Sequence, residues 1–112
     1  MALTIPEIMQ GMPEALIPEK AAGVNANVQL DFSADGGGMY VVHIADGKCD
    51  VREGQIDQPN ATMTTSAANY IAIVEGRLDG MKAFMTGQLK VKGDLALMMK
   101  FQQMFDTSKA RQ

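Results

Sequence analysis

Apolar and polar residues alternate strictly along residues 24–32, VNANVQLDF, where every even position is apolar and every odd position is polar. A period of two residues is typical of a β-strand with one face in the core and the other in water. The glycine-rich residues 33–38 then predict a turn, and residues 39–45 predict a second strand. Asp46 and Gly47 are a hairpin signal, so residues 48–53 should return antiparallel.

A two-residue turn also fixes the register of the strands that it joins. Two shorter segments, 61–65 and 88–92, predict a fourth and a fifth strand, and in the latter the lysines share the face opposite the apolar residues. The cross-strand pairs expected in the hairpin are Ile44 with Cys49 and Val42 with Val51 on one face, and His43 with Asp50 and Val41 with Arg52 on the other.

Capping signals place the helices. Thr4 and Glu7 have the spacing of a capping box and begin a helix. Pro13 and Pro18 should limit its extent, so that at most a short helical turn over residues 14–17 fits between them. From Ser66 onward the apolar residues recur at helical spacing. Three further helices are expected from their N-cap residues: Ser66 through Glu75, Asp79 through Met85 or Thr86, and Asp94 to about Phe105.

The composition is that of one globular domain over residues 1–112, with residues 107–112 as a polar tail. No apolar run approaches the roughly 18 residues of a membrane span, and the N-terminus does not resemble a signal peptide. The single cysteine, Cys49, fits a reducing, cytoplasmic setting. The net charge of −3 argues against a nucleic-acid partner.

Charge and methionine are unevenly distributed. Residues 1–79 carry four basic and eleven acidic side chains, whereas residues 80–112 carry six basic and two acidic ones. Five of the ten methionines lie between Met81 and Met104. Methionine is flexible and suits surfaces that accept varied apolar shapes. The last third of the chain is therefore both cationic and rich in adaptable apolar side chains.

A catalytic or metal-binding set is not found. His43 could act as a base beside Asp50, but the register makes these residues cross-strand neighbours on an open sheet face. Cys49 alternates with polar residues and is expected to be a buried, inert thiol. The glycines at 36–38 lie between strands and cannot form a P-loop, and the calcium-like residues that begin at Asp31 lack the final glutamate. We expect no enzyme activity, no metal and no cofactor.

The last helix is apolar around an unusually wide face. Leu95 and Met99 extend this face around the cylinder, so the helix is expected to make apolar contacts on more than one side. The two preceding helices offer matching apolar residues, and Met81, Phe84 and Met85 are expected to face the interior. The three helices could pack together or enclose a cavity against the sheet.

Residues 75–101, EGRLDGMKAFMTGQLKVKGDLALMMKF, closely resemble the signature of the sterol carrier protein type-two family. The shared features are an Ala-Phe-Met turn and a Gly-x-Leu-x-Val-x-Gly-Asp segment before an apolar helix. The resemblance implies an α+β fold: a five-stranded, mostly antiparallel twisted sheet covered on one face by helices, with an apolar cavity between the layers. The residues expected to contact a ligand are Ile71, Val74, Met81, Phe84, Met85, Leu97, Met98, Phe101, Met104 and Phe105.

The function expected from this resemblance is that of an intracellular carrier of a fatty acyl chain, a sterol or another apolar ligand. An alternative is an accessory protein that presents isoprenoid or quinone intermediates to partner enzymes. A small acyl-thioester hydrolase with His43 or an aspartate as base has less support. Four lysines could add transient contact with an anionic membrane surface, namely Lys82, Lys90, Lys92 and Lys100. Lys82 is the best placed of them to lie near a ligand.

Overall fold

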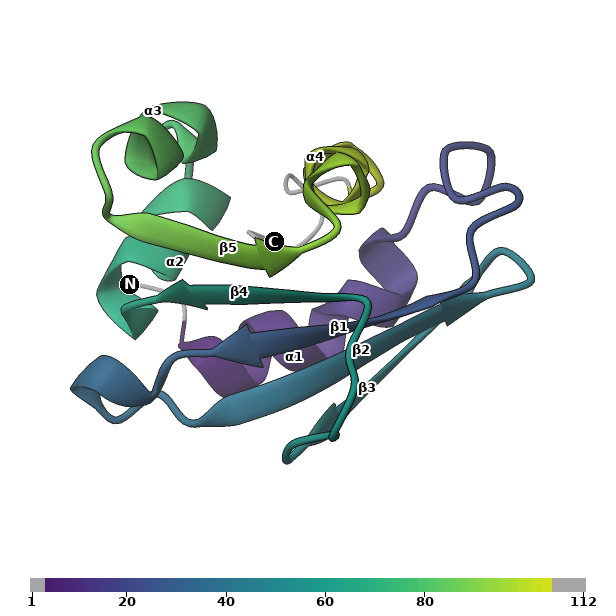
Figure 1. The fold of residues 1–112 in the computed structure, drawn as a ribbon, viewed down its shortest axis with the longest axis horizontal. Coiled ribbons are helices and arrows are strands. Elements are labelled where there is room, and N and C mark those ends of the chain that lie inside the picture. Colours follow the sequence, from purple (N-terminus) through teal and green to yellow (C-terminus); the bar gives the residue numbers. More distant parts are fainter. Residues whose placement is uncertain (1–3, 106–112) are drawn as a thin grey trace.

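The computed structural model describes residues 4–105 apart from the side chain of Gln102. It consists of a five-stranded sheet with helices on one face (Figure 1). The strand order is β3-β2-β1-β4-β5, and the architecture is the expected α+β fold. The elements are α1 (Ile5–Ala15), β1 (Ala26–Asp31), the short 3₁₀ helix η1 (Ser33–Asp35), β2 (Met39–Ala45), β3 (Lys48–Glu53), β4 (Ala61–Thr65), α2 (Ala67–Val74), α3 (Gly80–Met85), β5 (Leu89–Gly93) and α4 (Leu95–Gln103).

Strands β1, β2 and β3 form an antiparallel meander with the predicted hairpin between β2 and β3. Asp46 and Gly47 both have positive φ, at 54° and 71°, as a two-residue hairpin turn of this kind requires. All four predicted cross-strand pairs of this hairpin are confirmed. The turn dipeptide therefore determined which strand residues face the core.

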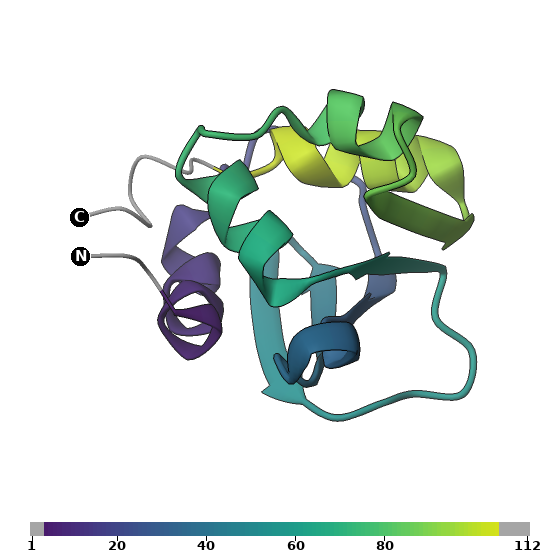
Figure 2. The same ribbon diagram turned by 90° about the vertical axis from the view of Figure 1, so that its left-hand side faces the viewer.

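The two halves of the sheet meet where β4 pairs in parallel with β1. To reach that position from β3, residues 54–60 cross the sheet on the side opposite the helices, as Figure 2 shows. The crossing segment is held by Gln29, whose Nε2 donates to the carbonyl oxygen of Gly54 at 2.9 Å and whose Oε1 accepts from the backbone N–H of Ile56 at 3.0 Å.

The expectation that this outer face is wholly in water is wrong at two positions. Gln29 and its strand partner Val41 are both buried there. Because the amide of Gln29 satisfies backbone groups of the crossing segment, its burial leaves no polar atom without a partner. The polar side chain of Gln29 thus binds the segment that covers it. An alternation of apolar and polar residues cannot distinguish such a buried polar side chain from one in water.

Helix α1 begins at the predicted capping box, in which the Thr4 side chain accepts from the Glu7 backbone N–H and the Glu7 carboxylate accepts from Thr4. The prediction that Pro13 limits this helix is wrong, because the helix continues to Ala15. Proline removes the hydrogen bond to the residue four positions earlier. Here the apolar side chains of α1, which are buried against the rest of the core, hold the last turn together despite that loss.

The core lies between the helices and one face of the sheet. Even-numbered residues of β1 and β2 face the helices, and Val28, Leu30 and Ile44 are fully buried there. Met98 and Phe101 of α4, and Met104 directly after it, pack into the same core. Both layers therefore present apolar side chains to one another over the whole helical face.

Candidate functional site

The helices of the C-terminal half are fixed at their N-termini by side-chain caps. Asp79 accepts from the backbone N–H of Met81 at 2.8 Å, and Asp94 accepts from that of Leu97 at 3.0 Å. Helix α2 is capped twice, by the predicted Ser66 and by Asp35 of η1, whose two carboxylate oxygens accept from the first two backbone N–H groups of the helix. Satisfied N-termini hold these short helices in place above the sheet.

An apolar pocket of about 130 Å³, which we call the inner pocket, lies between α2, α4 and strands β4 and β5. Phe101 and Phe105 form part of its wall and pack edge to face, with ring centroids 5.0 Å apart. A free volume of this size inside a protein has room for several water molecules or methylene groups. The lining residues are Met63, Tyr70, Ile73, Val74, Leu89, Phe101 and Phe105.

A second apolar pocket, the outer pocket, lies between α3, β5 and α4 and measures about 50 Å³. Leu89 lines both pockets and is itself buried, so its side chain stands between them. The residues around the outer pocket are Gly80, Met81, Phe84, Leu89, Val91, Leu95, Met98 and Met99. The two pockets together are lined only by residues 63–105, from β4 onward.

Tyr70 is the one residue in the lining of the inner pocket that carries a hydroxyl group. Its ring packs against Phe32, with centroids 4.9 Å apart, and burial raises the pKa of the phenol far above its usual range, with a smaller contribution from Cys49. None of the hydrogen bonds among the described residues involves this hydroxyl, and no fully buried polar atom there lacks a partner. The oxygen therefore keeps some accessible surface.

The structure brings together six of the ten residues expected to contact a ligand. Val74, Phe101 and Phe105 line the inner pocket. The outer pocket is lined by three more: Met81, Phe84 and Met98. Ile71, Leu97 and Met104 line neither pocket and pack in or against the core.

Met85 does not face the interior as expected, because 76% of its side chain is exposed and it lines neither pocket. Leu95 and Met99 are about half exposed, and they line the outer pocket together with residues of α3 and β5, so α4 meets apolar residues on this second side as well. Helix α3 is only six residues long, and its buried residue is Ala83. A short helix that docks through one small residue leaves its larger apolar side chains outside.

Several lining residues were absent from the expected set. Leu89 and Val91 have the alternation of a strand and were assigned to the core, and Met63 belongs to a segment too short to signal anything beyond a strand. Their inward direction follows from the sheet register, in which Thr65 pairs with Leu89 and Met63 with Val91. Alternation identifies such residues as facing inward, but it cannot show where the facing layer leaves a gap.

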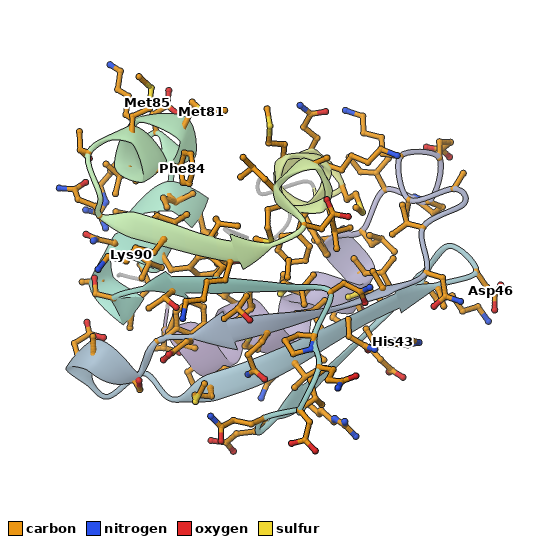
Figure 3. All side chains as sticks on the ribbon, viewed as in Figure 1. His43, Asp46, Met81, Phe84, Met85 and Lys90 are labelled. Atoms are coloured by element: carbon orange, nitrogen blue, oxygen red, sulfur yellow. The ribbon has the colours of Figure 1, made fainter. Side chains whose placement is uncertain are left out.

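The outer face of the sheet holds the candidate base. His43 is exposed, and its Nδ1 lies 2.7 Å from Oδ1 of Asn27, whereas Asp50 is its cross-strand neighbour on β3. Figure 3 places His43 on the sheet and away from α3, the helix that carries Met81 and Phe84. Cys49 is buried on the helical face, and that burial, with a smaller contribution from Asp50, raises the pKa of its thiol to about 12. Within residues 4–105, no three side chains of the metal-binding types cluster together.

The model of the SCP-2 sterol transfer family matches residues 7–106, which is most of the chain. The chain belongs to this family. Hydroxysteroid dehydrogenase-like protein 2 of Homo sapiens is 24% identical over 108 residues, covering 96% of this chain and 26% of the relative. Stomatin-like protein 1 of Mus musculus is 32% identical over 92 residues, covering 81% of this chain and 23% of the relative. The chain thus spans about a quarter of the length of these curated relatives.

Several solved structures share this fold. The palmitated SCP2L2 protein of Aedes aegypti superimposes with a TM-score of 0.74 at 22% identity, covering 90% of this chain and 93% of that one. A ubiquinone synthesis protein, UbiJ-SCP2, superimposes with a TM-score of 0.62 at 13% identity, covering 83% and 76% of the two chains. The sec-alkylsulfatase Pisa1 of Pseudomonas sp. superimposes with a TM-score of 0.75 at 20% identity, with 85% of this chain matching 15% of the larger protein.

None of the helices within residues 4–105 is long and apolar enough to cross a bilayer.

Proposed function

We propose that this protein is a non-catalytic lipid carrier, which holds an acyl chain or a similarly apolar ligand between the helices and the sheet. The observation that carries the proposal is the pair of apolar pockets separated by Leu89, in a chain of the SCP-2 sterol transfer family. Transfer of methylene groups from water into such an apolar site is favourable by about 0.8 kcal/mol each. A tail that enters both pockets would therefore bind without a charged anchor.

Binding of a long tail requires side chains to move, because the pockets measure about 130 and 50 Å³. Methionines supply this freedom, since the thioether chain has three rotatable bonds and low rotamer barriers. Met63 lines the inner pocket, and Met98 and Met99 line the outer one. A partly filled site with flexible walls avoids the cost of a large empty cavity in the protein without ligand.

The polar end of the ligand is proposed to be uncharged where it reaches the inner pocket. No Lys, Arg or His side chain lines that pocket, and Tyr70 is the one lining residue with a hydroxyl group. An ionised carboxylate would lose its hydration there without a cation to replace it. An alcohol, a carbonyl or a protonated acid could instead exchange one hydrogen bond with Tyr70.

The direct test is displacement of a fluorescent fatty acid by unlabelled lipids, together with native mass spectrometry of the purified protein. We expect a dissociation constant in the micromolar range or below and a co-purified lipid mass. Phe101→Asp, which places a carboxylate in the inner pocket wall, should abolish binding, and circular dichroism must exclude loss of folding as the cause. Absence of both displacement and bound lipid in the wild type would refute the proposal.

A second candidate is presentation of isoprenoid or quinone intermediates to a partner enzyme. The likeness to the ubiquinone synthesis protein supports the fold for such a role, and the same pockets would serve it. Enrichment of quinone precursors over fatty acids in lipid extracted from the purified protein would favour this candidate.

Thioester hydrolysis has less support, because His43 lies on the outer face of the sheet and lines neither the inner nor the outer pocket.

We also propose that the protein works in the cytoplasm. Its lone cysteine is a free, buried thiol, which a reducing compartment suits. Fractionation of the producing cells, followed by detection of the protein in each fraction, tests this assignment.

A further inference from the structure

Five large apolar side chains of the described residues are exposed, and all five belong to α3 and α4. Single exposed apolar residues are ordinary on protein surfaces, whereas a group of them marks a surface that contacts something else. We call this group the α3–α4 patch. Its members are Met81 (45% exposed), Phe84 (37%), Met85 (76%), Leu95 (46%) and Met99 (49%).

The patch is continuous because it surrounds one opening. Four of its members line the outer pocket together, and Met85 lies one helical turn beyond Met81 on α3. Figure 3 shows Met81 and Met85 on the side of α3 remote from the sheet, and Phe84 between α3 and β5. A ligand tail in the outer pocket would therefore leave the protein through this patch.

The charges around the patch are mostly positive, although Asp79, which caps α3 beside Met81, is also exposed there. Lys82 on α3 and Lys100 on α4 are exposed beside the apolar residues, and Lys90 and Lys92 project from β5 at the edge of the sheet. None of the four takes part in an ion pair among the described residues. The acidic residue among positions 80–105, Asp94, caps α4. The rest of the chain, residues 1–79, has eleven acidic and four basic side chains, so the surplus of positive charge coincides with the exposed apolar surface.

A lipid bilayer with anionic headgroups matches both properties, since its interface accepts apolar side chains and its surface attracts lysines. Helix α1 offers no comparable surface, because its large apolar residues, from Ile5 to Met12, are buried in the core. We propose that the α3–α4 patch docks onto anionic bilayers and that the outer pocket is the entrance through which a lipid tail passes. The docking step stands by itself, whereas the entrance rests on the proposed lipid-binding function.

Vesicle co-sedimentation tests the docking step, with phosphatidylcholine vesicles that either contain or lack phosphatidylserine. Met85→Glu and Lys82→Glu are the informative variants, because both side chains are exposed and neither lines a pocket. Lys48→Glu is the matched control, since it makes the same charge reversal at an exposed position on β3. We expect several-fold stronger binding to the anionic vesicles, lost at high salt. Each patch variant should weaken that binding about tenfold or more, and the control less than twofold.

Three results would overturn the docking proposal. The first is equal binding to both kinds of vesicle, and the second is an equal loss of vesicle binding in Lys48→Glu and Lys82→Glu. The third is a dimer in sedimentation equilibrium that Met85→Glu dissociates, which would assign the patch to a second copy of the chain. Fatty acid displacement without vesicles separates the two proposals. Met85→Glu should leave that affinity unchanged, and a wild type that binds vesicles but no fatty acid would support docking while refuting the lipid-binding function and the entrance.

Discussion

Replacing Leu89 with alanine should join the inner and outer pockets into one cavity. The side chain is 2% exposed and contacts both pockets, so its three outer carbon atoms form the partition between volumes of about 130 and 50 Å³. Leu→Ala substitutions in cores cost about 2.7–5.0 kcal/mol of unfolding free energy, with the larger values where the cavity stays open. Because voids already border Leu89 on two sides, we expect a loss of about 3–5 kcal/mol.

The same substitution should change which ligand binds. Each additional buried methylene contributes about 0.8 kcal/mol, or roughly fourfold in affinity. If the joined cavity accepts three more methylenes, the affinity for a long acyl chain should increase by up to about 50-fold relative to a short one, less the cost of ordering the chain. The variant should therefore be less stable when empty and should regain stability with a long-chain ligand.

The assay is urea denaturation with and without saturated fatty acids of increasing length, alongside competition for a fluorescent fatty acid. Leu30→Ala is the matched control: Leu30 is also a strand leucine, fully buried, and lines neither pocket. It should be destabilised to a similar degree without any shift in chain-length preference. If Leu89→Ala destabilises the protein but leaves that preference unchanged, the two pockets are not parts of one ligand site.

Three further predictions concern other parts of the molecule. Gly93→Ala should lower the unfolding free energy by roughly 2–5 kcal/mol, because φ is +88° and an added Cβ would lie 2.6 Å from the carbonyl oxygen of Asn60. The control is Gly87→Ala, where φ is +80° but an added Cβ would meet no atom within 4 Å. It should lower the unfolding free energy by less than half as much in the same urea titration. Backbone hydrogen bonds from Ala67 and Ala68 lower the pKa of Asp35, so the stabilisation is present above the unfolded value and is lost as pH falls through the folded one; the acid limb of a stability–pH curve should be flatter in Asp35→Asn. Cys49, whose pKa burial raises to about 12, should react with iodoacetamide at pH 8 only in denaturant, and rapid labelling of the folded protein would show that the core opens there.

Local signals in the sequence predicted the elements with near-residue accuracy. The Asp46-Gly47 turn determined the register of β2 and β3, and the capping residues Ser66, Asp79 and Asp94 marked the first turns of α2, α3 and α4. These signals succeed because each depends on atoms within a few residues of one another. Hydrogen bonds of a cap or a tight turn form whatever the rest of the chain does.

The site was predictable in part only, because pockets depend on contacts between distant segments. Phe101 and Val74 were expected from helix faces and line the inner pocket, but nothing near Met85 in the sequence shows that α3 docks through Ala83 and leaves that methionine outside. The partition at Leu89 is similar: alternation along β5 predicts an inward side chain without predicting the gaps on either side of it. Local periodicity gives the direction of a residue, and only tertiary packing decides what it meets.

The crossing segment has a consequence for how the chain folds during its synthesis. The meander of β1, β2 and β3 is complete before β4 is made, and the seam between β1 and β4 joins residues as far apart as Asn27 and Asn60, 33 positions along the chain. Such distant pairings close later than hairpins. Until then the backbone of β1 is an unprotected strand edge that could pair with another chain. Nascent chains should therefore be most prone to aggregate in the interval between the emergence of β3 and that of β4.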